Sequence, residues 1–124
     1  MIPFYGRWCS AYNDVLIAGS AHATLTGLNG NDFLEASQYG DDTLEGGGNG
    51  SDTFCAESGQ VAGYSCAKAG TGAAGGDTMI GGSGTNYFFA KNGEVDTITG
   101  GPGINYLVDD PNDDITNPSA FTGM

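Results

Sequence analysis

The side chains with the clearest chemical potential in this sequence are aspartates. Aspartate outnumbers glutamate eleven to four, and only three basic residues oppose these fifteen acids, which leaves a formal charge of −12 at pH 7. A merely solubilising surface would not favour the shorter acid so strongly, whereas tight turns and sites for hard cations such as calcium would. Self-repulsion at this charge also destabilises a compact state unless cations bind. The composition therefore indicates aspartate turns with cation binding as their candidate chemistry.

Other kinds of site are not expected. The sequence has a single histidine, His22, and no two cysteines at the spacing of zinc ligands. Paired acids such as Asp41 and Asp42 would face opposite sides of a strand. The negative surface repels phosphate backbones, and no apolar run approaches the length of a membrane span. We therefore predict a non-enzymatic protein that binds no nucleic acid and does not insert into membranes.

Turn-ending residues, seven of them aspartates, recur at a regular interval, and this interval identifies the elements that must position them. Residues that end turns are found at 14, 23, 32, 42, 52, 77, 86, 96, 105 and 113. Two steps make a coil of about nineteen residues with one strand on each face, and the one long step contains an inserted loop at 57–72. We predict a single all-β domain over 1–124. It is a β-solenoid with two facing short-stranded sheets, whose repeats span 13–116.

The apolar residues fix the register of this solenoid. Side chains alternate faces along a strand, so the second residue after each turn-ending position should point inward. These positions form two facing columns, and all ten residues are apolar: Leu16, Leu34, Phe54, Phe88 and Leu107 in one, and Leu25, Leu44, Met79, Ile98 and Ile115 in the other. Scattered apolar residues would not fill every predicted slot.

The turns carry a recognisable motif. Segment 47–55 (GGNGSDTFC) fits Gly-Gly-x-Gly-x-Asp-x-apolar-x without a mismatch, and segment 27–35 (GLNGNDFLE) differs only at its second position. Segments 81–86 and 100–105 keep the glycines but end in asparagine. The pattern resembles the haemolysin-type calcium-binding (RTX) nonapeptide repeat family, whose fold is the parallel β-roll. The resemblance covers about residues 13–116.

The resemblance implies calcium as the cofactor, bound between successive turns by backbone carbonyls and by the aspartate at the sixth position. Glycines allow carbonyls to point at one centre, as a cation with about six to eight oxygen ligands requires. The best pair of turns ends at Asp32 and Asp52, and Asp14 is a thinner candidate because the glycines are missing there. The predicted metal-site residues are Gly27, Asn29, Asn31, Asp32, Gly47, Asn49, Ser51, Asp52 and Asp14.

Two departures from the family pattern leave alternatives open. Asn86 and Asn105 offer only a neutral amide, so we expect weak or absent calcium there and a stacked asparagine ladder in its place. On the opposite edge only fragments of the glycine frame remain. The acids of that edge are either calcium ligands or Asx-type turns that bond nearby backbone N–H groups: Asp42, Asp77, Asp96 and Asp113.

The cysteines and the two ends complete the expectations. A disulfide between Cys55 and Cys66 would pin the inserted loop, with Cys9 as the alternative partner of Cys66. Segment 1–12 is an N-terminal cap or docking segment, and segment 117–124 is a C-terminal tail. Aromatic residues at the ends either close the solenoid or mediate end-to-end self-association.

We predict a secreted, extracellular calcium-binding solenoid with a structural or adhesive role that assembles into a fibre or layer. The alternative is an accessory module of a larger secreted RTX protein, such as an alginate epimerase, a protease or a toxin. In that setting it would aid folding or bind polysaccharide.

Overall fold

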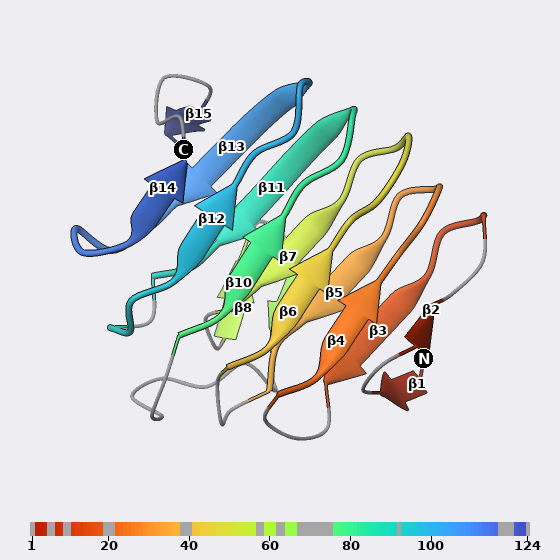
Figure 1. The fold of residues 1–124 in the computed structure, drawn as a ribbon, viewed down its shortest axis with the longest axis horizontal. Helices are drawn as coiled ribbons and strands as arrows, with labels where there is room; N and C mark the ends of the chain where they lie inside the picture. Colours follow the sequence, from red (N-terminus) through yellow and green to blue (C-terminus); the bar gives the residue numbers. More distant parts are fainter. Residues whose placement is uncertain are drawn as a thin grey trace.

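Two parallel β-sheets face each other across one apolar interior in the computed structural model (Figure 1). The structure describes residues 2–4, 7–8, 11–18, 22–37, 41–56, 59–61, 64–66, 76–91, 93–116 and 121–123. The chain alternates between the sheets and makes about four solenoid turns, about 19 residues apart. The predicted parallel β-solenoid is confirmed, and the described residues contain no helix.

The strands add to each sheet in the order of the coils. Sheet A consists, in spatial order, of β1 (Ile2–Phe4), β3 (Val15–Ala18), β5 (Phe33–Glu35), β7 (Thr53–Cys55), β11 (Thr85–Phe89), β13 (Ile104–Val108) and β15 (Phe121–Gly123). Sheet B consists of β14 (Asp114–Thr116), β12 (Thr97–Thr99), β10 (Thr78–Ile80), β6 (Thr43–Glu45), β4 (Thr24–Thr26) and β2 (Arg7–Trp8). All neighbours in both sheets pair in parallel.

Both predicted inward columns are confirmed. In sheet A, Leu34 pairs with Phe54, and Phe54 pairs with Phe88 across the insertion. The rings of these two phenylalanines stack with centroids 4.6 Å apart and planes 7° from parallel. Nine of the ten predicted residues are buried, and Ile115, in the last coil of sheet B, packs against them while partly exposed. Side-chain alternation together with the coil spacing therefore sets the core.

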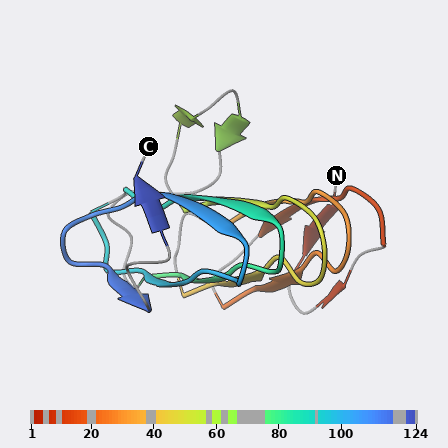
Figure 2. The same cartoon turned by 90° about the horizontal axis from the view of Figure 1, so that it is seen from above.

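The insertion lies where the sequence predicts it, but it has structure of its own. Strands β8 (Gly59–Val61) and β9 (Tyr64–Cys66) form an antiparallel hairpin. Figure 2 shows this hairpin standing away from one face of the solenoid. Cys55, at the end of β7, is disulfide-bonded. The side chains of Cys9 and Cys66 lie outside the described residues, so the pairing with Cys66 stays a prediction.

The two ends extend the sheets. Strands β1 and β2 pair with β3 and β4, so part of segment 1–12 adds a strand to each sheet. At the other end β15 pairs with β13. The ring of Phe121 packs edge-on against Phe88, with centroids 5.7 Å apart. No helix of the described chain is long and apolar enough to cross a bilayer.

Candidate metal centre

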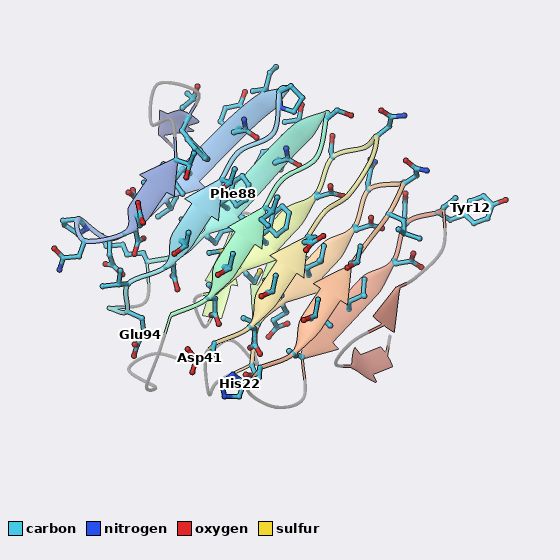
Figure 3. The ribbon with its side chains drawn as sticks, viewed as in Figure 1. Tyr12, His22, Asp41, Phe88 and Glu94 are labelled. Carbon is cyan, nitrogen blue, oxygen red and sulfur yellow. The ribbon has the colours of Figure 1, made fainter. Side chains whose placement is uncertain are left out.

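The candidate centre lies along the edge where the chain passes from sheet B into sheet A. Tyr12 lies at this edge in Figure 3, whereas His22 and Asp41 lie at the opposite one. Gly30 and Gly50 have φ angles of 118° and 131°, which L-residues rarely adopt. A Cβ atom on Gly50 would overlap the carbonyl oxygen of Gly30. The glycines therefore serve two purposes: they shape each turn and allow it to stack on the next one.

The aspartates that end these turns connect one coil to the next through a single carboxylate oxygen. The backbone N–H of Asp32 donates to Oδ1 of Asp52 at 3.0 Å, and that of Asp14 donates to Oδ1 of Asp32 at 2.9 Å. Both Asp32 and Asp52 are almost fully buried. Their second oxygens, Oδ2, are also buried but have no hydrogen-bond partner. Each site therefore holds a buried acceptor whose bonding capacity is unused.

These unpartnered oxygens lie inside their own turns. A Cβ atom on Gly27 would collide with Oδ2 of Asp32, and one on Gly46 would collide with Oδ2 of Asp52. Only glycine leaves room for the carboxylate at these positions. The arrangement concentrates negative charge in a cradle of backbone.

Burial of these acids is unfavourable without a cation. Desolvation raises the pKa of Asp32 from 3.8 to about 6, and the neighbouring charges of Asp52 and Asp14 add to the rise. Desolvation likewise raises the pKa of Asp52, opposed by its bond from the Asp32 N–H. A buried unpaired carboxylate is stabilised by protonation, by a donor or by a metal ion.

The residues present fit calcium. The ion prefers oxygen ligands, and carboxylates and backbone carbonyls are the groups that these turns offer. Asp32 and Asp52 would hold it, and the bound ion would neutralise their buried charges and cross-link two coils. Among the described residues no three of histidine, cysteine, aspartate and glutamate converge, so the acids at any site must be supplemented by other oxygens.

The remaining predicted residues lie at the same edge but on its outside. The backbone N–H of Asn49 donates to the Asn29 side chain at 3.0 Å, and that of Ser51 donates to the Asn31 side chain at 2.8 Å. Both asparagines are exposed. Their side chains therefore join neighbouring turns at the surface, and any share in a metal site would come from their carbonyls. Asp14 lies at the same edge and is half-buried.

One residue of this centre, Gly46, is missing from the sequence prediction. Turn 46–52 is one residue longer than turn 27–32, because Gly46 occupies the position beside its aspartate that Gly27 occupies in the shorter turn. Gly47 stacks instead on Leu28. The sequence contains one indication of this extra residue: ten residues separate the turn-ending positions 42 and 52, whereas nine separate positions 23 and 32. Leu28 itself has a φ of 78°, a left-handed conformation that costs a non-glycine residue about 1–2 kcal/mol.

The asparagine turns form the predicted ladder. The side-chain amide of Asn86 donates to the Asn105 side chain at 2.9 Å and to the Gly82 carbonyl at 3.0 Å. That of Asn105 donates to the Gly101 carbonyl at 2.9 Å. Both asparagines are buried.

The opposite edge is a ladder of acids that runs between coils. Asp42, Asp77 and Asp96 are buried, and Asp113 is half-buried. Each accepts a bond from the backbone N–H one coil earlier: Ala23 to Asp42 at 2.8 Å, Asp42 to Asp77 at 2.9 Å, Asp77 to Asp96 at 2.7 Å, and Asp96 to Asp113 at 3.0 Å. In these bonds donor and acceptor lie a full coil apart, unlike the local turns that one reading of the sequence predicts. Local bonds occur in addition at two of the acids: Asp42 Oδ2 accepts from the Ser37 N–H at 2.7 Å, and Asp113 Oδ2 accepts from the Asp110 N–H at 2.9 Å.

This ladder makes stability depend on pH. Desolvation raises the pKa of Asp77 from 3.8 to about 7, and the charges of Asp42 and Asp96 contribute. The folded state therefore binds more protons than the unfolded state between about pH 4 and 7. Without calcium, we expect the stabilisation that comes from the protonated Asp77 to be fully present below pH 4. It should fall by up to about 1.4 kcal/mol per pH unit as the pH rises towards 7.

Urea unfolding in EGTA at several pH values measures this dependence. Asp77→Asn keeps an acceptor for the Asp42 N–H and should make the profile less steep, leaving the part of the slope that comes from Asp32. Asp114→Asn removes an equal charge at an exposed position and should leave the slope in place. A stability that rises with pH over this range would contradict the assignment.

Comparison with known families supports the motif. The model of the RTX calcium-binding nonapeptide repeat matches residues 10–44 and 71–94, with four copies. The matched ranges contain the turn ending at Asp32 and the turn ending at Asn86, whereas turn 46–52 lies outside them. Comparisons with curated proteins and with solved structures gave no match.

Proposed function

This chain carries RTX calcium-binding nonapeptide repeats wound into a parallel β-roll, and on that premise we propose that it is an extracellular structural module completed by calcium. In this module, calcium between turns 27–32 and 46–52 would cross-link two coils whose aspartates otherwise repel each other. The module then presents its sheet faces in a structural or adhesive role.

The observation that carries this proposal is the pair of buried Oδ2 atoms of Asp32 and Asp52, which have no partner and face glycine backbone. A purely structural aspartate turn would be expected to satisfy both oxygens. On the opposite edge Asp42 does so, since its Oδ2 accepts bonds from both the N–H and the hydroxyl of Ser37 at 2.7 Å. The contrast between the two edges favours a cation at Asp32 and Asp52.

Three further features favour the cell exterior. Cys55 is disulfide-bonded, and structural disulfides persist mainly in oxidising compartments outside the cytosol. Calcium sites of extracellular modules commonly work at about 10⁻⁴ to 10⁻³ M, the range in which a site with two carboxylates is useful. A chain with a net charge of −12 is also stabilised most where divalent cations are abundant, because they reduce its self-repulsion.

Self-association is part of the proposal. Strands β14 and β2 are the outermost described strands of sheet B at its two ends. All neighbouring strands of the sheet run parallel, so a second copy stacked head to tail would continue it in the same sense.

A calcium titration tests the calcium role. We expect the strand signal in circular dichroism and the melting temperature to rise with calcium. At a calcium concentration of one hundred times the Kd, the free energy of unfolding should increase by about 2.7 kcal/mol. Magnesium should act more weakly because it demands near-ideal octahedral geometry. Asp32→Ala and Asp52→Ala should abolish most of the gain, and Asp114→Ala, at an exposed position, should preserve it. Indifference of the wild-type protein to calcium and to EGTA would refute the proposal.

A further inference from the structure

The four glycine turns that enter sheet A place one side-chain atom at the same position. Beside Gly27 and Gly46 this atom is the Oδ2 of Asp32 and of Asp52. Beside Gly81 and Gly100 it is the amide nitrogen of an asparagine, 2.7 Å from where a Cβ atom of the glycine would lie: Asn86 in the first turn and Asn105 in the second. All four turns place a glycine beside this atom, although turn 46–52 is one residue longer and the residues with positive φ differ between the aspartate and the asparagine turns.

The two kinds of atom have opposite needs. A carboxylate oxygen only accepts, whereas an amide nitrogen donates two hydrogen bonds. The Asn86 nitrogen uses both, to the Gly82 carbonyl at 3.0 Å and to Asn105 Oδ1 at 2.9 Å. The Asn105 nitrogen donates to the carbonyls of its own turn, Gly101 at 2.9 Å and Gly103 at 3.4 Å. The amide nitrogens therefore bind turn carbonyls that would otherwise be available to a metal ion. The Oδ1 atom of Asn86 is also buried without a hydrogen-bond partner, but unlike the Oδ2 atoms of Asp32 and Asp52 it belongs to a neutral group.

We propose that Asn86 and Asn105 replace calcium with a neutral amide, so that the C-terminal coils fold without the ion and calcium orders only the N-terminal coils. This inference rests on the proposed calcium role of Asp32 and Asp52. The C-terminal half becomes a permanent scaffold, and residues 13–56 become the part of the module that responds to calcium.

The placement of the turns along the chain supports this division. The two aspartate turns precede the insertion, and the two asparagine turns follow it. The core of the C-terminal half is closed by Phe121, whose ring packs against Phe88. The Phe54–Phe88 stack, with centroids 4.6 Å apart, joins the halves and provides the surface on which the N-terminal coils order.

Hydrogen exchange of the full chain in calcium chloride and in EGTA tests the division. Calcium should slow exchange at least tenfold in residues 13–56 and less than threefold in residues 85–108. An equal effect in both halves would overturn the inference while leaving the calcium role intact. No effect in either half would overturn both.

Exchange of aspartate and asparagine at the ends of the turns provides the second test. In Asp32→Asn/Asp52→Asn, residues 13–56 should be protected in EGTA to within threefold of the calcium-loaded wild type. Protection of residues 85–108 in the same sample verifies that the variant is folded. Asp41→Asn/Asp114→Asn removes the same charge at exposed positions and should leave the calcium dependence unchanged.

The reverse variant, Asn86→Asp/Asn105→Asp, should make protection of residues 85–108 calcium-dependent. If the first variant keeps residues 13–56 unprotected in EGTA, as in the wild type, the amide does not replace the ion and the inference is overturned.

Discussion

Replacement of Gly50 by alanine is expected to unfold the calcium edge and to reduce stability by about 4 kcal/mol or more, which places it among the largest effects of a single substitution. The backbone of Gly50 has a φ of 131°, and its Cβ atom would overlap the carbonyl oxygen of Gly30. The obstacle is backbone of the neighbouring coil, so no side-chain movement relieves it. Small domains are stable by about 5–15 kcal/mol, so a loss of this size removes a large part of the total.

Gly93 provides the matched control for this prediction. Its φ is 86°, yet a Cβ atom there would meet no heavy atom within 4 Å. Gly93→Ala should therefore cost only the conformational term, about 1–2 kcal/mol. Urea unfolding of the two variants separates conformational strain from coil-to-coil overlap. Equal losses would show that the Gly50 turn does not stack closely on the backbone of Gly30.

Truncation of Phe54 to alanine is expected to destabilise the protein by about 3–5 kcal/mol, because a fully buried aromatic side chain leaves a cavity that the surrounding strands cannot fill. Phe54 is 0 % exposed, lies between Leu34 and Phe88 in its column, and stacks on Phe88 with planes 7° apart. Loss of the ring pair contributes about 0.5–1.5 kcal/mol beyond the loss of buried apolar area. Because the stack joins the halves, its loss should also reduce their cooperativity.

Phe33 is the control for this second prediction. It lies on the adjacent strand β5 but faces outward and is half-buried. Phe33→Ala should lose less than half as much stability in chemical unfolding. If both phenylalanines cost the same, the interior assigned from the alternation would be wrong.

The core was predictable from sequence because two constraints agree. Alternation along a strand selects every second residue, and the coil spacing selects which of these stack. Even across the insertion, Phe54 pairs with Phe88 and Leu44 with Met79 as the register requires. A register error of one residue in any coil would have assigned the inward residues of the following strands to the outer face.

Details of the site were less predictable. The motif fits 47–55 without a mismatch, and this agreement hid the extra residue that places Gly46, not Gly47, beside the aspartate. On the opposite edge, the bond from the Asp42 N–H to Asp77 crosses 35 residues of sequence, so no local rule identifies it. The hairpin of β8 and β9 and the first two strands lie outside the repeat pattern, and their pairing depends on tertiary contacts.

Crystals of the protein grown with calcium, with anomalous differences measured for the ion, provide the most direct test. We predict a calcium peak between turns 27–32 and 46–52, with carboxylate oxygens of Asp32 and Asp52 about 2.3–2.6 Å from it. An empty edge at saturating calcium, with both Oδ2 atoms bonded to water or protein donors instead, would contradict the account.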